Sequence, residues 1–182
     1  ESYGPALMAR IGQDAPGVRL HFLQKSDKNS SALRDGLVDM ETGVIGPETG
    51  PEIRAQALFH DRFVGVMRLG HRLCNGGMST ERYAAGRHVL VARHGLDRGP
   101  VAQGLKAVGH VRDIAITVEG FSAALALARA SDLIATVPER HTTALREGMH
   151  TFALPFPVEG VTVSLLWHPR MDADPAHRWL RR

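Results

Sequence analysis

The sequence has little cysteine and no long apolar run. Its single cysteine, Cys74, has no second cysteine for an internal disulfide, which fits a reducing cytosol and argues against a two-cysteine redox switch. The apolar stretches fall well short of the ~18 residues that a membrane-spanning helix needs. Residues 1–15 include Arg10 and Asp14, which do not suit the apolar core of a signal peptide. These absences predict a cytoplasmic protein without a membrane segment.

Histidines and basic residues are plentiful but not clustered. The 10 histidines form no His-x-His or His-Glu-x-x-His motif, and none pairs with another ligand on one helix face. The net charge is +3 and the pI is near 9.5, but Lys and Arg are scattered, and only Arg178, Arg181 and Arg182 gather. Basic and aromatic residues do not alternate as in a base-stacking platform. We therefore expect no metal, no cofactor and no nucleic-acid-binding face within these residues.

Helical and strand patterns alternate along the chain. Its 182 residues are enough to bury about 70% of the unfolded surface. Apolar periodicity and capping signals predict helices over 5–15, 29–39, 79–86, 99–109, 122–131 and 138–148 and from 175 onwards. Alternating or β-branched runs predict strands over 18–23, 62–67, 88–92, 113–118, 132–137 and 161–167. This order predicts βαβ units, and therefore mostly parallel sheets covered by helices.

Two α/β units can be distinguished, and the last strand and helix have no partner of their own. We expect them to return to the first unit, so that residues 1–69 and 155–182 form one lobe and residues 70–154 form a second. Ligands favour the cleft between two lobes, at the carboxyl ends of strands.

Three loops that follow predicted strands are rich in hydrogen-bond donors. One spans residues 24–31, one contains His94 and Arg98, and one is Gly120-Phe121-Ser122 at a helix start. A helix start offers free N–H groups and the positive end of the dipole to an anion. The first loop is equally well read as a turn with an N-cap. Without an acid/base pair or a nucleotide fingerprint, the loops predict binding of a small anionic or hydroxylated ligand, and no enzyme.

Ser122 offers an alternative reading as a nucleophile. Gly120-Phe121-Ser122-Ala123-Ala124 is nearly the Gly-x-Ser-x-Gly elbow of serine hydrolases, and Asp172 and His177 follow in the hydrolase order. Against this, no His-Gly-Gly oxyanion loop precedes it, and Asp172 and His177 flank a helix expected in the other lobe. The simpler reading is that Ser122 caps an alanine-rich helix.

Five stretches together resemble a known family. In order they are "PALMARIGQDAPGVRL", "ALRDGLVDMETG", "ALFHDRFVGVMRLGHRL", "ALALARASDLIATVPER" and "VSLLWHPRMDADPAHRWLR". No single stretch is diagnostic, but their order and spacing resemble the C-terminal effector-binding domain of LysR-type transcriptional regulators over the whole chain. The resemblance implies a two-lobed, periplasmic-binding-protein-like (type II) α/β fold with the effector between the lobes.

The resemblance also implies a set of effector-binding residues. By position these are Ser2, Tyr3, Ser26, Asp27, Gly43, Val44, Arg98, Gly120, Phe121 and Ser122. Arg98 and the helix start at 120–122 suggest a small carboxylate or aromatic acid as the effector.

Two departures from the family pattern stand out. The family domain opens with a strand and a cleft-lining loop, whereas this chain opens in the first helix, so the first strand and the N-terminal winged helix-turn-helix are expected to be missing. DNA binding is therefore implied for the parent protein. The other departure is Ser131-Asp132, where the family often has a glycine-rich turn.

The family's subunits also pair, which implies a homodimer or homotetramer. The first helix, 5–13, would pack on the 123–129 helix of a second subunit, although an amphipathic helix that covers its own sheet has the same apolar stripe. We thus interpret the chain as the effector-sensing domain of a bacterial LysR-type regulator. An extracytoplasmic solute-binding protein of the same fold is the rival interpretation, and a serine hydrolase is a more distant one.

Overall fold

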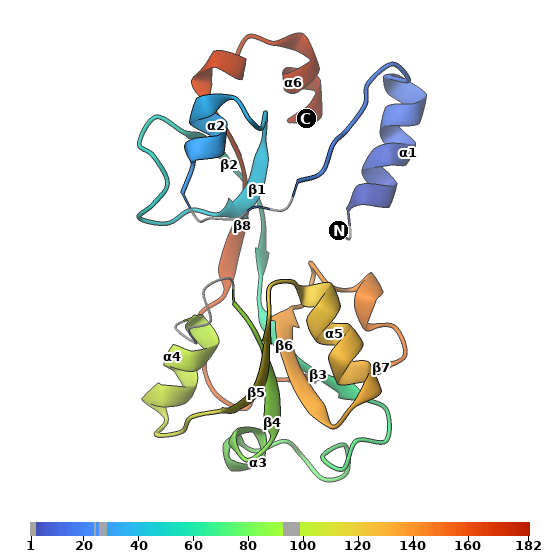
Figure 1. Cartoon of the computed structure of the whole chain (residues 1–182), viewed down its shortest axis with the longest axis vertical. Coiled ribbons are helices and arrows are strands. Elements are labelled where there is room, and N and C mark those ends of the chain that lie inside the picture. Colours follow the sequence, from blue (N-terminus) through green and yellow to red (C-terminus); the bar gives the residue numbers. More distant parts are fainter. Residues whose placement is uncertain (1–2, 24, 26–28, 93–98) are drawn as a thin grey trace. The chain divides into compact units, whose positions relative to one another are not determined.

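The computed structural model describes residues 3–23, 25, 29–92 and 99–182, which form two compact units (Figure 1). The larger unit contains Glu1–Leu23 and Arg62–Gly160, and the smaller unit contains Gln24–Asp61 and Val161–Arg182. The finer lobe boundaries expected from the sequence stay a prediction.

Short helices and strands alternate over most of the chain. The helices are α1 (Gly4–Asp14), α2 (Ser31–Asp35), α3 (Thr80–Ala84), α4 (Pro100–Ala107), α5 (Phe121–Ala130) and α6 (Pro175–Leu180). The strands are β1 (Glu41–Val44), β2 (Arg54–Asp61), β3 (Phe63–Arg68), β4 (Arg87–Val91), β5 (Asp113–Val118), β6 (Leu133–Pro138), β7 (Met149–Ala153) and β8 (Val161–Trp167). Two short 3₁₀ turns, Ala144–Arg146 and Pro169–Met171, complete the described elements.

The larger unit is built on a five-stranded mixed sheet of order β5-β4-β6-β3-β7. β4 runs parallel to β5 and β6, while β3 runs antiparallel to β6 and β7. Helix α5 covers one face, where it buries Ala124, Leu125 and Ala128 against valines of β3, β4 and β6. Because successive strand residues point to opposite faces, Ile134 of β6 packs on the other face with residues of α3 and α4.

Helix α4 lies very close to the chain that returns from β7. A Cβ atom added at Gly104 would come within 2.3 Å of the Pro157 carbonyl oxygen. No real Cβ tolerates that approach, so a glycine is needed here even though it weakens the helix. The contact fixes the position of α4 on its face of the sheet.

The smaller unit is organised around the last strand of the chain. β8 lies between β1 and β2 and runs antiparallel to both. The Trp167 indole N–H donates to Asp172 Oδ1 at 2.6 Å, and the Arg181 guanidinium lies 4.8 Å from the Trp167 ring centre. Asp174 caps α6 by accepting from the His177 N–H at 2.8 Å. The final strand and helix therefore complete the smaller unit, as Figure 1 shows in red.

The prediction of mostly parallel sheets was wrong in detail, although the two-sheet α/β class is confirmed. Every described pairing in the smaller sheet is antiparallel, and the larger sheet is parallel only on its β4 side. Residue patterns show that a segment is a strand but do not give its direction. Here β8 returns from the far end of the chain between two strands that run the opposite way.

The strand predicted over residues 18–23 does not form. Residues 18–23 have no regular structure, and Phe22 and Leu23 are 68% and 57% exposed. Their alternating pattern suits a strand, but a strand also needs a hydrogen-bonded neighbour, and the described residues provide none. Strands β1, β2 and β7 were not predicted.

The helix expected over 138–148 is mostly a loop. Pro138 instead ends β6, and only Ala144–Arg146 are helical, as a 3₁₀ turn. Thr142 Oγ1 donates to the Pro138 carbonyl at 2.6 Å, and Arg146 donates to the Glu139 carbonyl at 2.7 Å. These side chains take the carbonyls that a helix would use for its own hydrogen bonds.

A glycine-to-alanine pair tests the close packing of α4. We expect Gly104→Ala to lower the free energy of unfolding by about 1–2 kcal/mol, because the overpacking exceeds the gain in helix propensity. The control is Gly12→Ala in α1, where a Cβ meets nothing within 4 Å and the variant should be neutral or more stable by up to about 1 kcal/mol. Urea unfolding measures both. Equal effects of the two substitutions would contradict the packing argument.

An ion pair between neighbouring strands makes the stability depend on pH. Arg62, before β3, donates to both Glu139 oxygens at 2.5 and 2.9 Å. The Arg62 hydrogen bonds, more than its charge, lower the pKa of Glu139 in the folded state, against a smaller opposing effect of burial. The stabilisation is therefore complete above the unfolded pKa of about 4.5 and is lost as the pH falls through the lower folded pKa.

We accordingly expect Glu139→Gln to be less stable than the wild type at pH 7. The difference should shrink as the pH is lowered below about 4.5, where the wild-type carboxyl also becomes neutral. Urea unfolding of both proteins between pH 3 and pH 7 measures it. A difference that does not change with pH would mean that the charge of Glu139 does not contribute.

Candidate functional site

The carboxyl ends of three parallel strands meet at one edge of the larger sheet. β4 ends at Val91, β5 at Val118 and β6 at Pro138. The Ala92 N–H donates to the Val118 carbonyl at 2.9 Å, which extends the pairing of β4 and β5 to this edge. In open α/β sheets, ligands bind beyond this edge.

Helix α5 begins at this edge without a side-chain cap. Its N-cap residue, Gly120, is extended (φ −133°, ψ 152°), and the first helical bond runs from the Ala124 N–H to the Gly120 carbonyl at 3.2 Å. The N–H groups of the first turn have no acceptor within the helix, and the dipole makes this end positive. A Cβ at Gly120 would meet only Ser122 Oγ, at 3.8 Å, so the backbone here is open to approach.

A second helix starts at the same edge. α4 follows β4 and leads into the parallel strand β5, so it runs back across the sheet and its first turn lies at the carboxyl edge. Its N-cap, Gly99, is extended and also makes no side-chain cap bond. The edge therefore receives the positive ends of two helix dipoles, which suits an anion.

His141 lies beside the start of α5. Its ring packs edge-to-face on the Phe121 ring, with the ring centres 5.9 Å apart and the planes at 70°. The position of His141 beside Phe121 was not predicted from the sequence. The signal that could have found it is the position of His141 just after β6, because β6 ends at the same edge as β4 and β5.

In the smaller unit, Lys25, which precedes α2, forms a nearly buried ion pair with Glu41 of β1. Lys25 Nζ donates to Glu41 Oε2 at 2.5 Å, and the Glu41 side chain is only 8% exposed. Asn29 Oδ1 accepts from both the N–H and the hydroxyl of Ser31, at 3.1 and 2.7 Å. Asn29 therefore forms a turn, whereas the N-cap of α2 is Ser30, whose side chain makes no cap bond.

Ser30 is fully buried, yet its hydroxyl has no hydrogen-bond partner among the described residues. Buried hydroxyls normally have a partner, so this one is a candidate donor to a group outside the described structure.

The predicted site residues that the structure describes lie in three places. Gly120, Phe121 and Ser122 lie together at the start of α5 in the larger unit. Gly43 and Val44 are adjacent on β1 of the smaller unit, opposite Ser164 and Val163 of β8, and Val44 is 54% exposed. Tyr3 precedes α1 and is 46% exposed. Ser2, Ser26, Asp27 and Arg98 lie outside the described residues.

The structure does not give Ser122 the surroundings of a hydrolase nucleophile. It is the second residue of a regular helix, and no described residue other than glycine has a positive φ, unlike the strained turn of a nucleophile elbow. Asp172 accepts from Trp167, and His177 Nε2 lies 4.0 Å from Asp39. Both side chains thus interact with residues of the smaller unit.

Comparisons with known proteins identify relatives that are all transcriptional regulators. The transcriptional activator NagR of Ralstonia is 29% identical to this chain in a match that covers 98% of this chain. The transcriptional regulator LinR of Sphingobium indicum is 32% identical in a match that covers 97% of this chain. The solved regulatory domain of MexT, a transcriptional activator in Pseudomonas aeruginosa, has 26% identity and a TM-score of 0.81, and the match covers 98% of this chain and 87% of that domain. The chain spans about 60% of NagR and LinR.

The family model described as the LysR substrate binding domain matches residues 2–182, nearly the full length of the chain. The order of strands and helices around the two sheets, the resemblance of the sequence and the regulatory relatives all agree with this match. The chain belongs to the LysR substrate-binding domain family.

Proposed function

We propose that the chain is the effector-sensing domain of a LysR-type transcriptional regulator and performs no catalysis itself. Its relatives are transcriptional regulators, so neither a solute-binding protein nor a serine hydrolase is supported. DNA binding would reside in a part of the parent protein that corresponds to the portion of NagR and LinR beyond this match. Binding of the effector would shift the protein between two conformations by as much as its affinity differs between them.

The effector in this proposal is a small carboxylate. The observation that carries it is the uncapped start of α5 at Gly120, at the carboxyl edge of the parallel strands. Backbone N–H groups at a helix start bind carboxylates without needing a basic side chain. Ser2, Tyr3, Ser26, Asp27, Gly43, Val44 and Arg98 stay predicted contributors.

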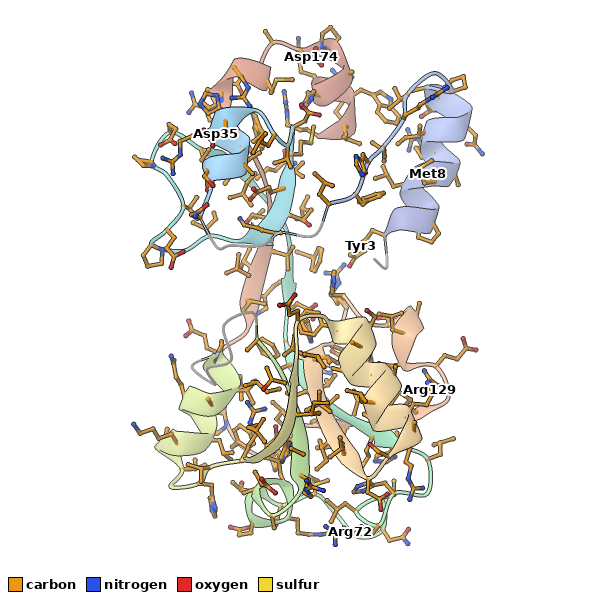
Figure 2. The ribbon with its side chains drawn as sticks, in the orientation of Figure 1. Tyr3, Met8, Asp35, Arg72, Arg129 and Asp174 are labelled. Carbon is orange, nitrogen blue, oxygen red and sulfur yellow. The ribbon has the colours of Figure 1, made fainter. Side chains whose placement is uncertain are left out.

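We also propose that the chain works as a homodimer or homotetramer in the cytoplasm. The outward face of α5 carries Ala123, Ala126 and Ala130, all exposed, which would let a second helix approach closely. α1 presents Met8, which is 46% exposed (Figure 2). No helix among the described residues is long and apolar enough to cross a bilayer.

Adding a carboxylate at the start of α5 tests the effector site. Gly120 has an extended backbone that an aspartate adopts easily, and a new side chain there would cap α5 and occupy the positive end of its dipole. We expect Gly120→Asp to keep or slightly raise the free energy of unfolding, by a few tenths of a kcal/mol, and to weaken carboxylate binding at least tenfold.

The measurement begins with thermal melting of the wild type against a panel of small aliphatic and aromatic carboxylates. A ligand at 100 times its Kd adds about 2.7 kcal/mol and should raise the Tm by about 5–10 °C. Calorimetric titration of the best ligand then compares Gly120→Asp with Gly77→Asp. This control has the same charge in the same unit, at a position where a Cβ meets nothing within 4 Å. Equal affinities in the two variants would show that the effector does not bind at the start of α5.

A charge on the outer face of α5 tests the subunit contact. Ala126 is exposed, so Ala126→Glu should leave the fold intact but oppose close approach of a second helix. Sedimentation velocity should show a smaller species than for the wild type. The control is Ala107→Glu at the exposed end of α4, which should keep the wild-type assembly. An Ala126→Glu protein that sediments as the wild type does would place the interface elsewhere.

A further inference from the structure

The larger sheet has a hollow of about 530 Å³ near the amino ends of its parallel strands, where β4, β5 and β6 begin. Ile116 and Leu133 contribute apolar side chains to it, and Arg72 and Asp132 contribute charged ones. Figure 2 shows Arg72 at the end of the larger unit remote from the start of α5. The hollow is therefore separate from the site proposed for the effector.

The hollow exists because α5 leaves part of the sheet uncovered. Val89 of β4 is buried under α5, and its partner Ile116 on β5 lies on the same face but is 39% exposed. β5 is the edge strand of the sheet, and its register with β4 shifts between His88 and Val89. Such a bulge changes the direction of neighbouring side chains. The result is an apolar surface that no described side chain covers.

The turn between α5 and β6 forms a fixed wall of this hollow. Ser131 Oγ donates to the Leu127 carbonyl at 2.7 Å and accepts from the Leu133 N–H at 3.3 Å. Arg68 donates to Asp132 Oδ1 through two nitrogens, at 2.9 and 2.6 Å. This is the Ser131-Asp132 pair that departs from the family's glycine-rich turn, and its side-chain hydrogen bonds hold the turn in one conformation.

Of the charged side chains that line the hollow, Arg72 has the weakest pairing. Arg68 neutralises the Asp132 carboxylate. The hydrogen bonds from Arg68 are the main cause of the lowered pKa of Asp132. Arg87 pairs with its cross-strand neighbour Asp113 at 3.6 Å. Arg72 makes no hydrogen bond or ion pair with the residues that the structure describes, but its charge is one of the smaller causes that lower the pKa of Asp132. A guanidinium beside an exposed apolar surface matches a small molecule with a carboxylate at one end and an apolar body.

We propose that this hollow is a second ligand site, which binds small monocarboxylates with an apolar body. Arg72 receives the carboxylate, and the body of the ligand covers Ile116 and Leu133. The site neither uses Gly120–Ser122 nor depends on the effector proposal. The ligand binds to a face of the sheet beside the Ser131 turn, which is already held in place. Binding therefore needs no rearrangement of the strands.

The test is a titration of the ¹⁵N-labelled chain with benzoate, followed in amide NMR spectra. Benzoate should shift the Ile116, Ser131 and Leu133 signals in a saturable way. Benzamide, which has the same shape without the charge, should bind at least about tenfold more weakly, as should benzoate to Arg72→Gln. The control is Arg178→Gln, an exposed arginine of α6 in the smaller unit, which should bind as the wild type does.

The Gly120→Asp variant distinguishes the two sites. If the hollow binds independently, this variant keeps the benzoate-induced shifts at Ile116, Ser131 and Leu133. The proposal is overturned if benzoate moves only signals near the start of α5, if these shifts disappear in Gly120→Asp, or if Arg72→Gln binds benzoate as tightly as Arg178→Gln does. Spectra of the free variants show directly whether each one is folded.

Discussion

The parallel pairing of β4 with β5 and β6 is the constraint on which the functional features of the larger unit depend. Parallel neighbours cannot be joined by a tight turn, so each connection needs a crossover, which here contains α4 or α5. Both helices must then begin at the carboxyl edge of the strands, and their positive ends gather there. The same connections bring each helix to its end at the opposite edge, where the turn after α5 forms a wall of the hollow beside Arg72.

Two glycines have opposite roles in this arrangement. Gly104 lets α4 approach the carbonyl of Pro157, where no side chain fits. Gly120 is not needed for its conformation, because its backbone is extended and the space beside it is open. Because Gly120 has no side chain, α5 has no side-chain cap at its N-cap residue. Under the proposed function, the open backbone at Gly120 would leave room for the carboxylate of the effector.

The sequence predicted the elements that local signals determine. The start of α6 at Asp174-Pro175 and the cap of α3 at Ser79 follow from capping rules. The cap expected at Ser122 was wrong, because the N-cap of α5 is Gly120 and Ser122 is the second residue of the helix. The sequence could not give strand direction or the partner that residues 18–23 lack, because both depend on segments far away in the chain. For the same reason the sequence did not reveal His141, which contacts Phe121 because the sheet brings the ends of β5 and β6 to the same edge. Nor did it reveal the hollow beside Arg72, which depends on a register shift between β4 and β5.

The proposed effector site lies at the start of α5, where the carboxylate of a small effector would bind. The most direct measurement is a crystal structure of the chain with the carboxylate that raises the Tm most. We expect carboxylate oxygens within hydrogen-bond distance of backbone N–H groups in the first turn of α5, next to Gly120. Clear density for the ligand elsewhere, with that turn bound only to water, would contradict this proposal.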